Sequence, residues 1–163
     1  MHRGSAPGGG CVPPALLASS TASAAEDFSY QLNDQGFEKG HLTDVALTFA
    51  TPADLAAVMQ TVTSSQYRAC IADEVQGETA ATGVTVTGVA TAAVVPLPAP
   101  LHGLHVHISF PYVFGGQTKV AQDEVVYLTS GRLRVRLELD TCCTPFSTPV
   151  VDQLMSTAAA KMQ

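Results

Sequence analysis

The chain has 163 residues, of which 46% are hydrophobic and only 13% are charged, and its formal net charge is −6. This length suffices for one domain with a hydrophobic core. The acidic balance argues against nucleic acid or an anionic membrane as a partner. No apolar run approaches the roughly 18 residues that a membrane span requires.

The first 40 residues differ in composition from the rest. Residues 1–24 begin with a basic segment and a short apolar stretch, and Ala22-Ser23-Ala24 has the small-x-small pattern of a signal peptidase site. We therefore expect a signal peptide cleaved before Ala25 and a secreted or cell-envelope-associated protein. The alternative is a disordered tail on a cytoplasmic protein. Residues 25–40 are polar and turn-rich, which predicts a flexible linker.

The domain is expected to begin with one strand and two helices. Residues 41–50 alternate between apolar and polar side chains, as in a half-buried strand. Thr51 has the properties of an N-cap residue, with Pro52 at the first helical position. Residues 66–76 repeat apolar side chains at helical spacing, and Gly77 is expected to end this second helix.

The second half of the chain reads mainly as strands, at residues 82–90, 103–110 and 112–119. The segments 123–129 and 132–140 are expected to form a hairpin around Ser130-Gly131, which pairs Val126 with Val135. A final helix is expected to start near Thr144 and to run to the C-terminus.

These elements predict a single α+β domain at residues 41–163, in the order β-α-α-β-β-β-β-α. We expect an antiparallel sheet of four to five strands with the helices packed on one face. The other face would then be open to solvent.

Three histidines lie within the stretch LHGLHVHISF, residues 101–110. His105 and His107 are two apart on a strand, so their side chains point the same way and could share a metal ion, with His102 as a third ligand. The alternative is that both simply lie on the solvent side of the sheet. No cofactor is predicted.

A second polar stripe runs along residues 132–136. On the open face, it would form a cationic patch able to receive an anionic group. The simpler interpretation is pairing of the arginines with neighbouring acids and stacking of Arg134 on Tyr127. The expected ligand-binding residues are His105, His107, Tyr127, Arg134 and Arg136.

The cysteines predict a disulfide if the compartment is oxidising. Cys142 and Cys143 are adjacent and unsuited to bonding each other, so Cys70 is expected to pair with one of them. The sequence contains no nucleophile elbow, P-loop or zinc-protease motif, and no catalytic residue is predicted.

The run TFATPADLAAVMQTVTSSQYRACIADEV, followed by strands, DEVVYLTSGRLRVRLELD and a closing helix, resembles secreted sensor-type domains of actinobacteria. The extracellular domain of mycobacterial PknH-type receptor kinases is the best-known example. The resemblance covers about residues 44–163 and implies a non-enzymatic domain that binds an extracellular ligand in a cleft beside the sheet. This chain has no kinase domain and one unmatched cysteine, which favours a free-standing binding protein.

Two hypotheses follow. The first is an exported, non-enzymatic domain that binds a small ligand or an envelope protein. The second is a small metal-binding protein or enzyme that uses His102, His105 and His107. A cone-shaped isomerase-like domain is a third possibility, but that fold usually ends on strands, whereas this sequence ends on a helix.

Overall fold

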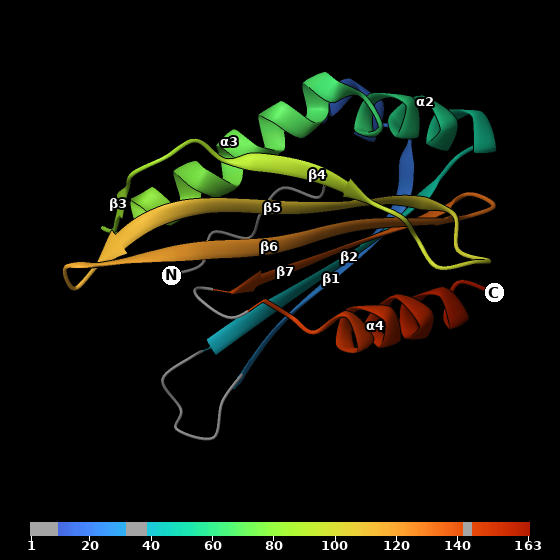
Figure 1. Cartoon of the computed structure of the whole chain (residues 1–163). Helices are drawn as coiled ribbons and strands as arrows, with labels where there is room; N and C mark the ends of the chain where they lie inside the picture. Colours follow the sequence, from blue (N-terminus) through green and yellow to red (C-terminus); the bar gives the residue numbers. More distant parts are fainter. Residues whose placement is uncertain (1–9, 32–38, 142–144) are drawn as a thin grey trace.

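The computed structural model describes residues 10–31, 39–141 and 145–163 and consists of one antiparallel sheet with helices on both of its faces (Figure 1). The α+β class and the antiparallel sheet are confirmed. Over the described residues the sheet has seven strands, in place of the expected four to five. Within the described ranges, no helix is long and apolar enough to cross a bilayer.

The element order is α-β-β-α-α-β-β-β-β-β-α, which adds a short helix and strands to the expected order. The spatial order of the strands is β1-β2-β7-β6-β5-β3, and β4 also pairs with β5. The helices are α1 (Pro14–Leu17), α2 (Pro52–Val62), α3 (Ser65–Ala81) and α4 (Thr148–Ala160). The strands are β1 (Ser20–Gln31), β2 (Lys39–Phe49), β3 (Thr85–Val86), β4 (Thr91–Val95), β5 (Gly103–Phe114), β6 (Gln117–Ser130) and β7 (Leu133–Thr141).

The start of α2 follows the sequence prediction. Thr51 and Asp54 form a reciprocal capping box, so the first amide groups of the helix are satisfied. By contrast, α3 does not end at Gly77 but continues to Ala81. The residues that follow Gly77 include good helix formers, and packing of α3 along the sheet outweighs the modest penalty of one glycine.

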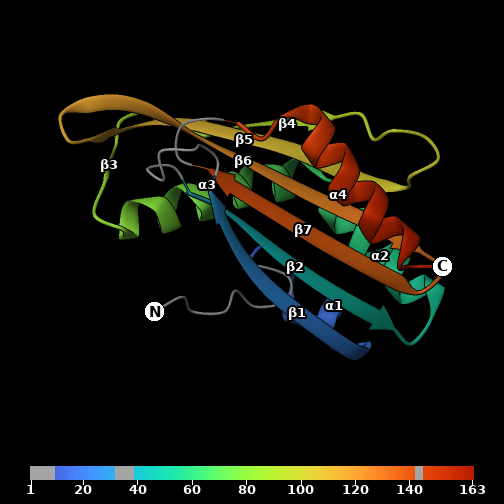
Figure 2. The ribbon, with the colours of Figure 1, turned by 90° about the horizontal axis from the view of Figure 1, so that it is seen from below.

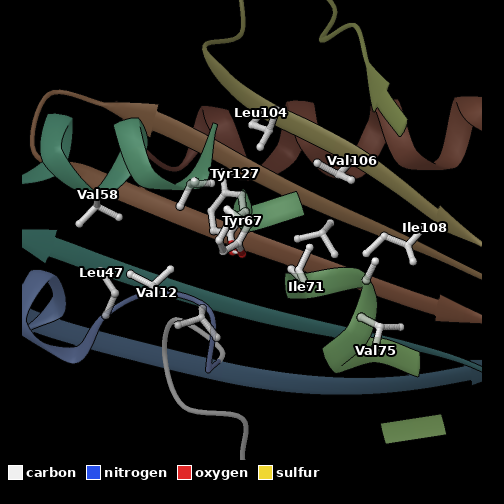
Figure 3. Close-up of a cluster of buried hydrophobic side chains, with 14 of the residues drawn as sticks. Val12, Leu47, Val58, Tyr67, Ile71, Val75, Leu104, Val106, Ile108 and Tyr127 are labelled. Carbon is white, nitrogen blue, oxygen red and sulfur yellow. Dashed lines mark hydrogen bonds between the residues drawn. The ribbon is translucent and has the colours of Figure 1, made fainter. Parts of the chain in front are cut away.

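The face of the sheet covered by α2 and α3, called the α3 face here, holds the larger apolar core (Figure 3). Side chains of the two helices pack against alternate residues of β5 and against Leu47 of β2. Val12, from the segment before α1, is buried in the same core. The labelled members are Val12, Leu47, Val58, Tyr67, Ile71, Val75, Leu104, Val106, Ile108 and Tyr127.

The opposite face, called the α4 face here, is covered in part by α4 (Figure 1). Val151 and Met155 of this helix pack on a second apolar cluster. The expected one-sided coverage is therefore wrong: the central strands carry apolar side chains on both faces, and each face needs a cover. The sheet contributes Val126, Leu128, Val135, Leu137 and Leu139 to this cluster.

The β6–β7 hairpin turns at Gly131-Arg132 and not at Ser130-Gly131, so Val126 pairs with Leu137 and not with Val135. Gly131 has a φ of +59°, a left-handed conformation that favours glycine. The pairing differs from the expected one by two residues. Because side chains alternate with a period of two, each keeps its expected face despite this difference.

The N-terminal region departs most from expectation. Residues 20–31 form β1, and β2 already starts at Lys39, so the described parts of residues 25–40 are strands and not a flexible linker. Cleavage before Ala25 would split β1 and would remove Val12 from the core. This fold therefore uses residues that the predicted cleavage would remove.

Candidate functional site

The five expected ligand-binding residues do not lie together. Cross-strand pairing places Leu104 opposite Tyr127, and His105 opposite Val126. Tyr127 therefore shares the α3 face with Leu104, whereas His105 and His107 point to the α4 face. Arg134 and Arg136 lie on the α3 face with Tyr127, so the predicted joint patch is wrong.

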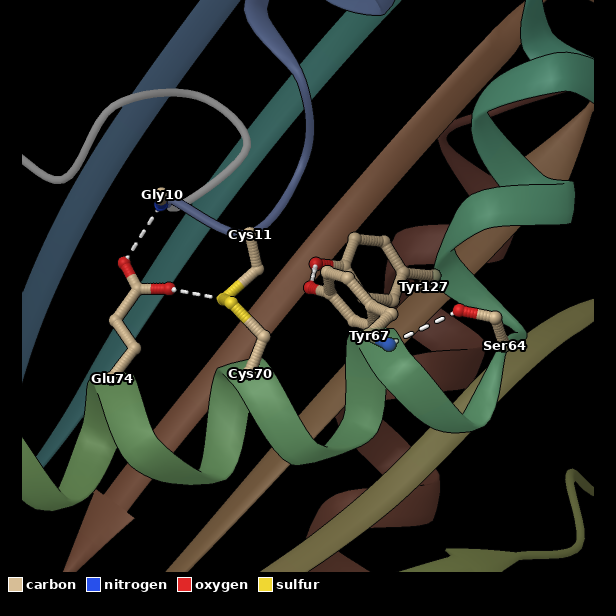
Figure 4. The surroundings of a disulfide bond; sticks show 7 residues. All are labelled: Gly10, Cys11, Ser64, Tyr67, Cys70, Glu74 and Tyr127. Carbon is tan, nitrogen blue, oxygen red and sulfur yellow. Dashed lines mark hydrogen bonds between the residues drawn. A yellow bond between two sulfur atoms is a disulfide. The ribbon is translucent and has the colours of Figure 1, made fainter.

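Tyr127 is the centre of a buried polar cluster beneath α3. Its hydroxyl hydrogen-bonds the hydroxyl of Tyr67, and the two rings meet edge to face with centroids 6.0 Å apart (Figures 3 and 4). Burial and the neighbouring Tyr127 raise the pKa of Tyr67 above its usual range. The Tyr67 backbone amide is held in turn by Ser64, the N-cap of α3.

The two arginines complete this cluster from β7. The guanidinium carbon of Arg134 lies 5.3 Å from the centroid of the Tyr127 ring, which is the stacking that the sequence predicted. Arg136 Nη2 lies 2.5 Å from Glu138 Oε2. The exposed fractions of Arg134 and Arg136 are 0% and 4%, so an anion from solvent cannot reach them without displacement of α3.

Acidic side chains lie on the same face, near the C-terminal end of β7. Asp123 lies directly across from Asp140 and is only 3% exposed, and its Oδ2 has no hydrogen-bond partner among the described residues. Burial raises the pKa of Asp123 well above its ordinary value, and the nearby Asp140 and Glu138 carboxylates add to this effect. The fold therefore favours the protonated form of this carboxyl over the ionised form.

On the α4 face, Glu124 bridges the two histidines of β5. His105 Nε2 lies 2.8 Å from one carboxylate oxygen, and His107 Nδ1 lies 2.8 Å from the other. Burial alone would raise the pKa of Glu124, but the hydrogen bonds from His105 and His107 outweigh it and lower that pKa. The arrangement joins β5 to β6 and keeps Glu124 ionised.

His102 does not lie with His105, His107 and Glu124, so the three histidines do not form a metal site. His102 lines a separate groove beside α2, and the described part of the chain contains no group of three or more His, Cys, Asp or Glu side chains placed to hold a metal ion. The expected grouping of His102, His105 and His107 is therefore not assembled.

The groove beside α2 has a volume of about 490 Å³ and lies between this helix and the β6–β7 turn. Its apolar wall comes from the first turns of α2, and its polar side comes from His102 and the end of β6. Sequence reasoning missed this site because α2 and the β6–β7 turn are far apart in the chain. The lining residues are Pro52, Leu55, Ala56, Met59, His102, Thr129, Ser130 and Gly131.

The disulfide joins Cys11 to Cys70, so the prediction that Cys70 pairs with Cys142 or Cys143 is wrong (Figure 4). Cys142 and Cys143 lie outside the described residues. Glu74, one helical turn after Cys70, accepts a hydrogen bond of 2.9 Å from the Gly10 amide. The disulfide holds the N-terminal segment on α3, beside the buried Val12. A disulfide is compatible with an exported protein.

No family model, no curated protein and no solved structure matches the chain.

Proposed function

We propose that the chain is an exported, non-enzymatic domain that binds a small, mainly apolar ligand, or an apolar segment of an envelope protein, in the groove between α2 and the β6–β7 turn. The observation that carries the proposal is the two-sided lining of the groove. Leu55 and Met59 form an apolar wall, and His102 and Thr129 supply polar groups opposite it.

This composition is typical of ligand sites. Pockets for small molecules usually have volumes of about 300–1,000 Å³, with mainly apolar walls and a few polar groups that orient the ligand. The groove falls in this range, and both of its walls are fixed. The α2 wall is anchored by the capping box at Thr51, and Arg132 in the turn donates a hydrogen bond of 3.0 Å to the Ala50 carbonyl.

Export is supported by the Cys11–Cys70 disulfide, because such bonds persist mainly in oxidising compartments. The resemblance to secreted sensor-type domains, which implies a ligand cleft beside the sheet, agrees with the position of the groove. The polar clusters favour a structural role over catalysis, since the arginines are sealed beneath α3 and the histidines both bind Glu124.

The test uses 1-anilinonaphthalene-8-sulfonate, an apolar probe with one anionic group, and follows the methionine methyl signals by NMR. We expect saturable binding that shifts the Met59 signal and leaves that of Met155, buried under α4, unchanged. Ala56→Trp, which fills the groove, should weaken binding by at least about tenfold. Ala57→Trp, one residue along α2 and outside the groove lining, is the matched control and should bind the probe normally.

Absence of saturable binding, or equal loss in the Ala56→Trp and Ala57→Trp variants, would contradict the proposal. Near-ultraviolet circular dichroism of each variant separates loss of the groove from loss of the fold.

A further inference from the structure

The β1 edge of the sheet is long, and no second described strand pairs with it. β1 has 12 residues and, among the described strands, pairs with β2 alone (Figure 2). Side chains at positions 21–29 are exposed, including Phe28 at 48%. One side of its backbone therefore has peptide groups available to another strand.

β1 also has few of the features with which proteins usually protect such an edge, since its charged side chains are limited to Glu26 and Asp27. It contains no proline, lysine or arginine, and its one irregularity in pairing falls at its start, between Ser20 and Ala22. The opposite edge is different, because β3 has two residues and β4 has five, and Pro96 follows β4 directly.

The sequence of β1 is complementary to itself in an antiparallel arrangement. With Ala24 opposite Ala24 of a second copy, Glu26 faces Ala22, and Asp27 faces Thr21. Small side chains thus meet at the centre, and no carboxylate lies directly opposite another despite the net charge of −6. Phe28 would lie opposite Ser20, where a neighbouring strand would cover part of its exposed ring.

We propose that two copies of this chain associate through antiparallel pairing of their β1 edges, about a two-fold axis that passes beside Ala24. A two-fold axis perpendicular to the sheet keeps α3 on one side and α4 on the other in both copies, so the sheet continues across the contact. A second copy is favoured over an unrelated peptide because the small centre and the separated charges match when β1 meets itself.

The test is sedimentation velocity of the oxidised full chain, at protein concentrations from micromolar to several hundred micromolar. We expect a concentration-dependent dimer. Ala24→Lys places two ammonium groups opposite each other at the axis, and Ala24→Glu places two carboxylates there. Each variant alone should raise the dimer dissociation constant by at least about tenfold.

An equimolar mixture of the two variants should restore dimers, and native mass spectrometry should identify them as mixed dimers. Ala93→Lys is the matched control: it adds the same charge to an exposed alanine on β4 at the other edge, and it should leave the dimer unchanged. A monomeric parent chain over the whole range would overturn the proposal. So would equal effects of Ala24→Lys and Ala93→Lys, or failure of folded variants to form mixed dimers.

Discussion

Asp123 and Glu124 are neighbours on β6, yet the two faces of the sheet treat their carboxylates in opposite ways. Asp123 points to the α3 face, where burial and other carboxylates raise its pKa. Glu124 points to the α4 face, where hydrogen bonds from His105 and His107 overcome burial and lower its pKa. The covering side chains, and not the residue type, decide whether a carboxylate stabilises the fold.

The two faces of the sheet also differ in what they bury and in how they are covered. The α3 face buries tyrosines, arginines and acids beneath two helices, and a disulfide attaches the N-terminal segment above them. The α4 face is closed by one helix on a mainly apolar cluster, with the two histidines and Glu124 to one side. We expect loss of the disulfide on the α3 face to destabilise the fold more than loss of side-chain contacts on the α4 face.

The largest expected effect comes from breaking that link. The bond spans a sequence separation of 59 residues, so its loss should lower the free energy of unfolding by about 4 kcal/mol in the chain-entropy model. Cys11→Ser, Cys70→Ser and the double variant should all show the same loss in urea unfolding. A loss confined to Cys70→Ser would mean that Cys70 has a different partner.

The second largest effect on stability is expected from a substitution on the α4 face. Glu124→Gln should lower the free energy of unfolding by about 2 kcal/mol at neutral pH, because two hydrogen bonds to a charged group are lost. The lowered pKa of Glu124 gives stability that is present above its ordinary pKa of about 4.5 and lost as the pH falls through the folded-state value. Urea unfolding across this range should show the parent and the variant converging at acidic pH. A constant difference would contradict this assignment.

The smallest effect has the opposite sign. Asp123→Asn should raise the free energy of unfolding by about 1 kcal/mol at neutral pH, since it removes a buried charge whose Oδ2 has no hydrogen-bond partner among the described residues. Because the pKa of Asp123 is raised in the fold, its carboxyl contributes fully to the free energy of unfolding below its ordinary pKa of 3.8. This contribution is lost as the pH rises through the folded-state pKa. The gain should therefore vanish in acid.

The matched control for this prediction is Asp73→Asn, on the exposed side of α3, which should leave stability nearly unchanged. Destabilisation by Asp123→Asn at neutral pH would show that the Asp123 carboxylate is stabilised in the fold.

Local patterns predicted the elements whose signals lie within a few residues. The alternation in β5 correctly separated His105 and His107 from Leu104 and Val106, and Thr51 correctly marked the start of α2. The hairpin kept the right faces although its turn was placed one residue too early.

Features that depend on distant partners could not be predicted in this way. The arginine stripe on β7 has the polarity of an exposed face. It is buried because α3 covers it, and the Tyr67 hydroxyl of α3 joins the polar cluster by its hydrogen bond to Tyr127. β1 lacks apolar alternation because it is exposed on both faces at the edge of the sheet, so its sequence resembles a linker. The groove likewise requires α2 and the β6–β7 turn to meet in space.

The attachment of the N-terminal segment to the α3 face is the central claim, and peptide mapping of the unreduced protein by mass spectrometry tests it most directly. The structure predicts a peptide that contains Cys11 linked to the peptide that contains Cys70. A Cys70 peptide linked to Cys142 or Cys143, or a free Cys11 in protein from an oxidising compartment, would contradict this account.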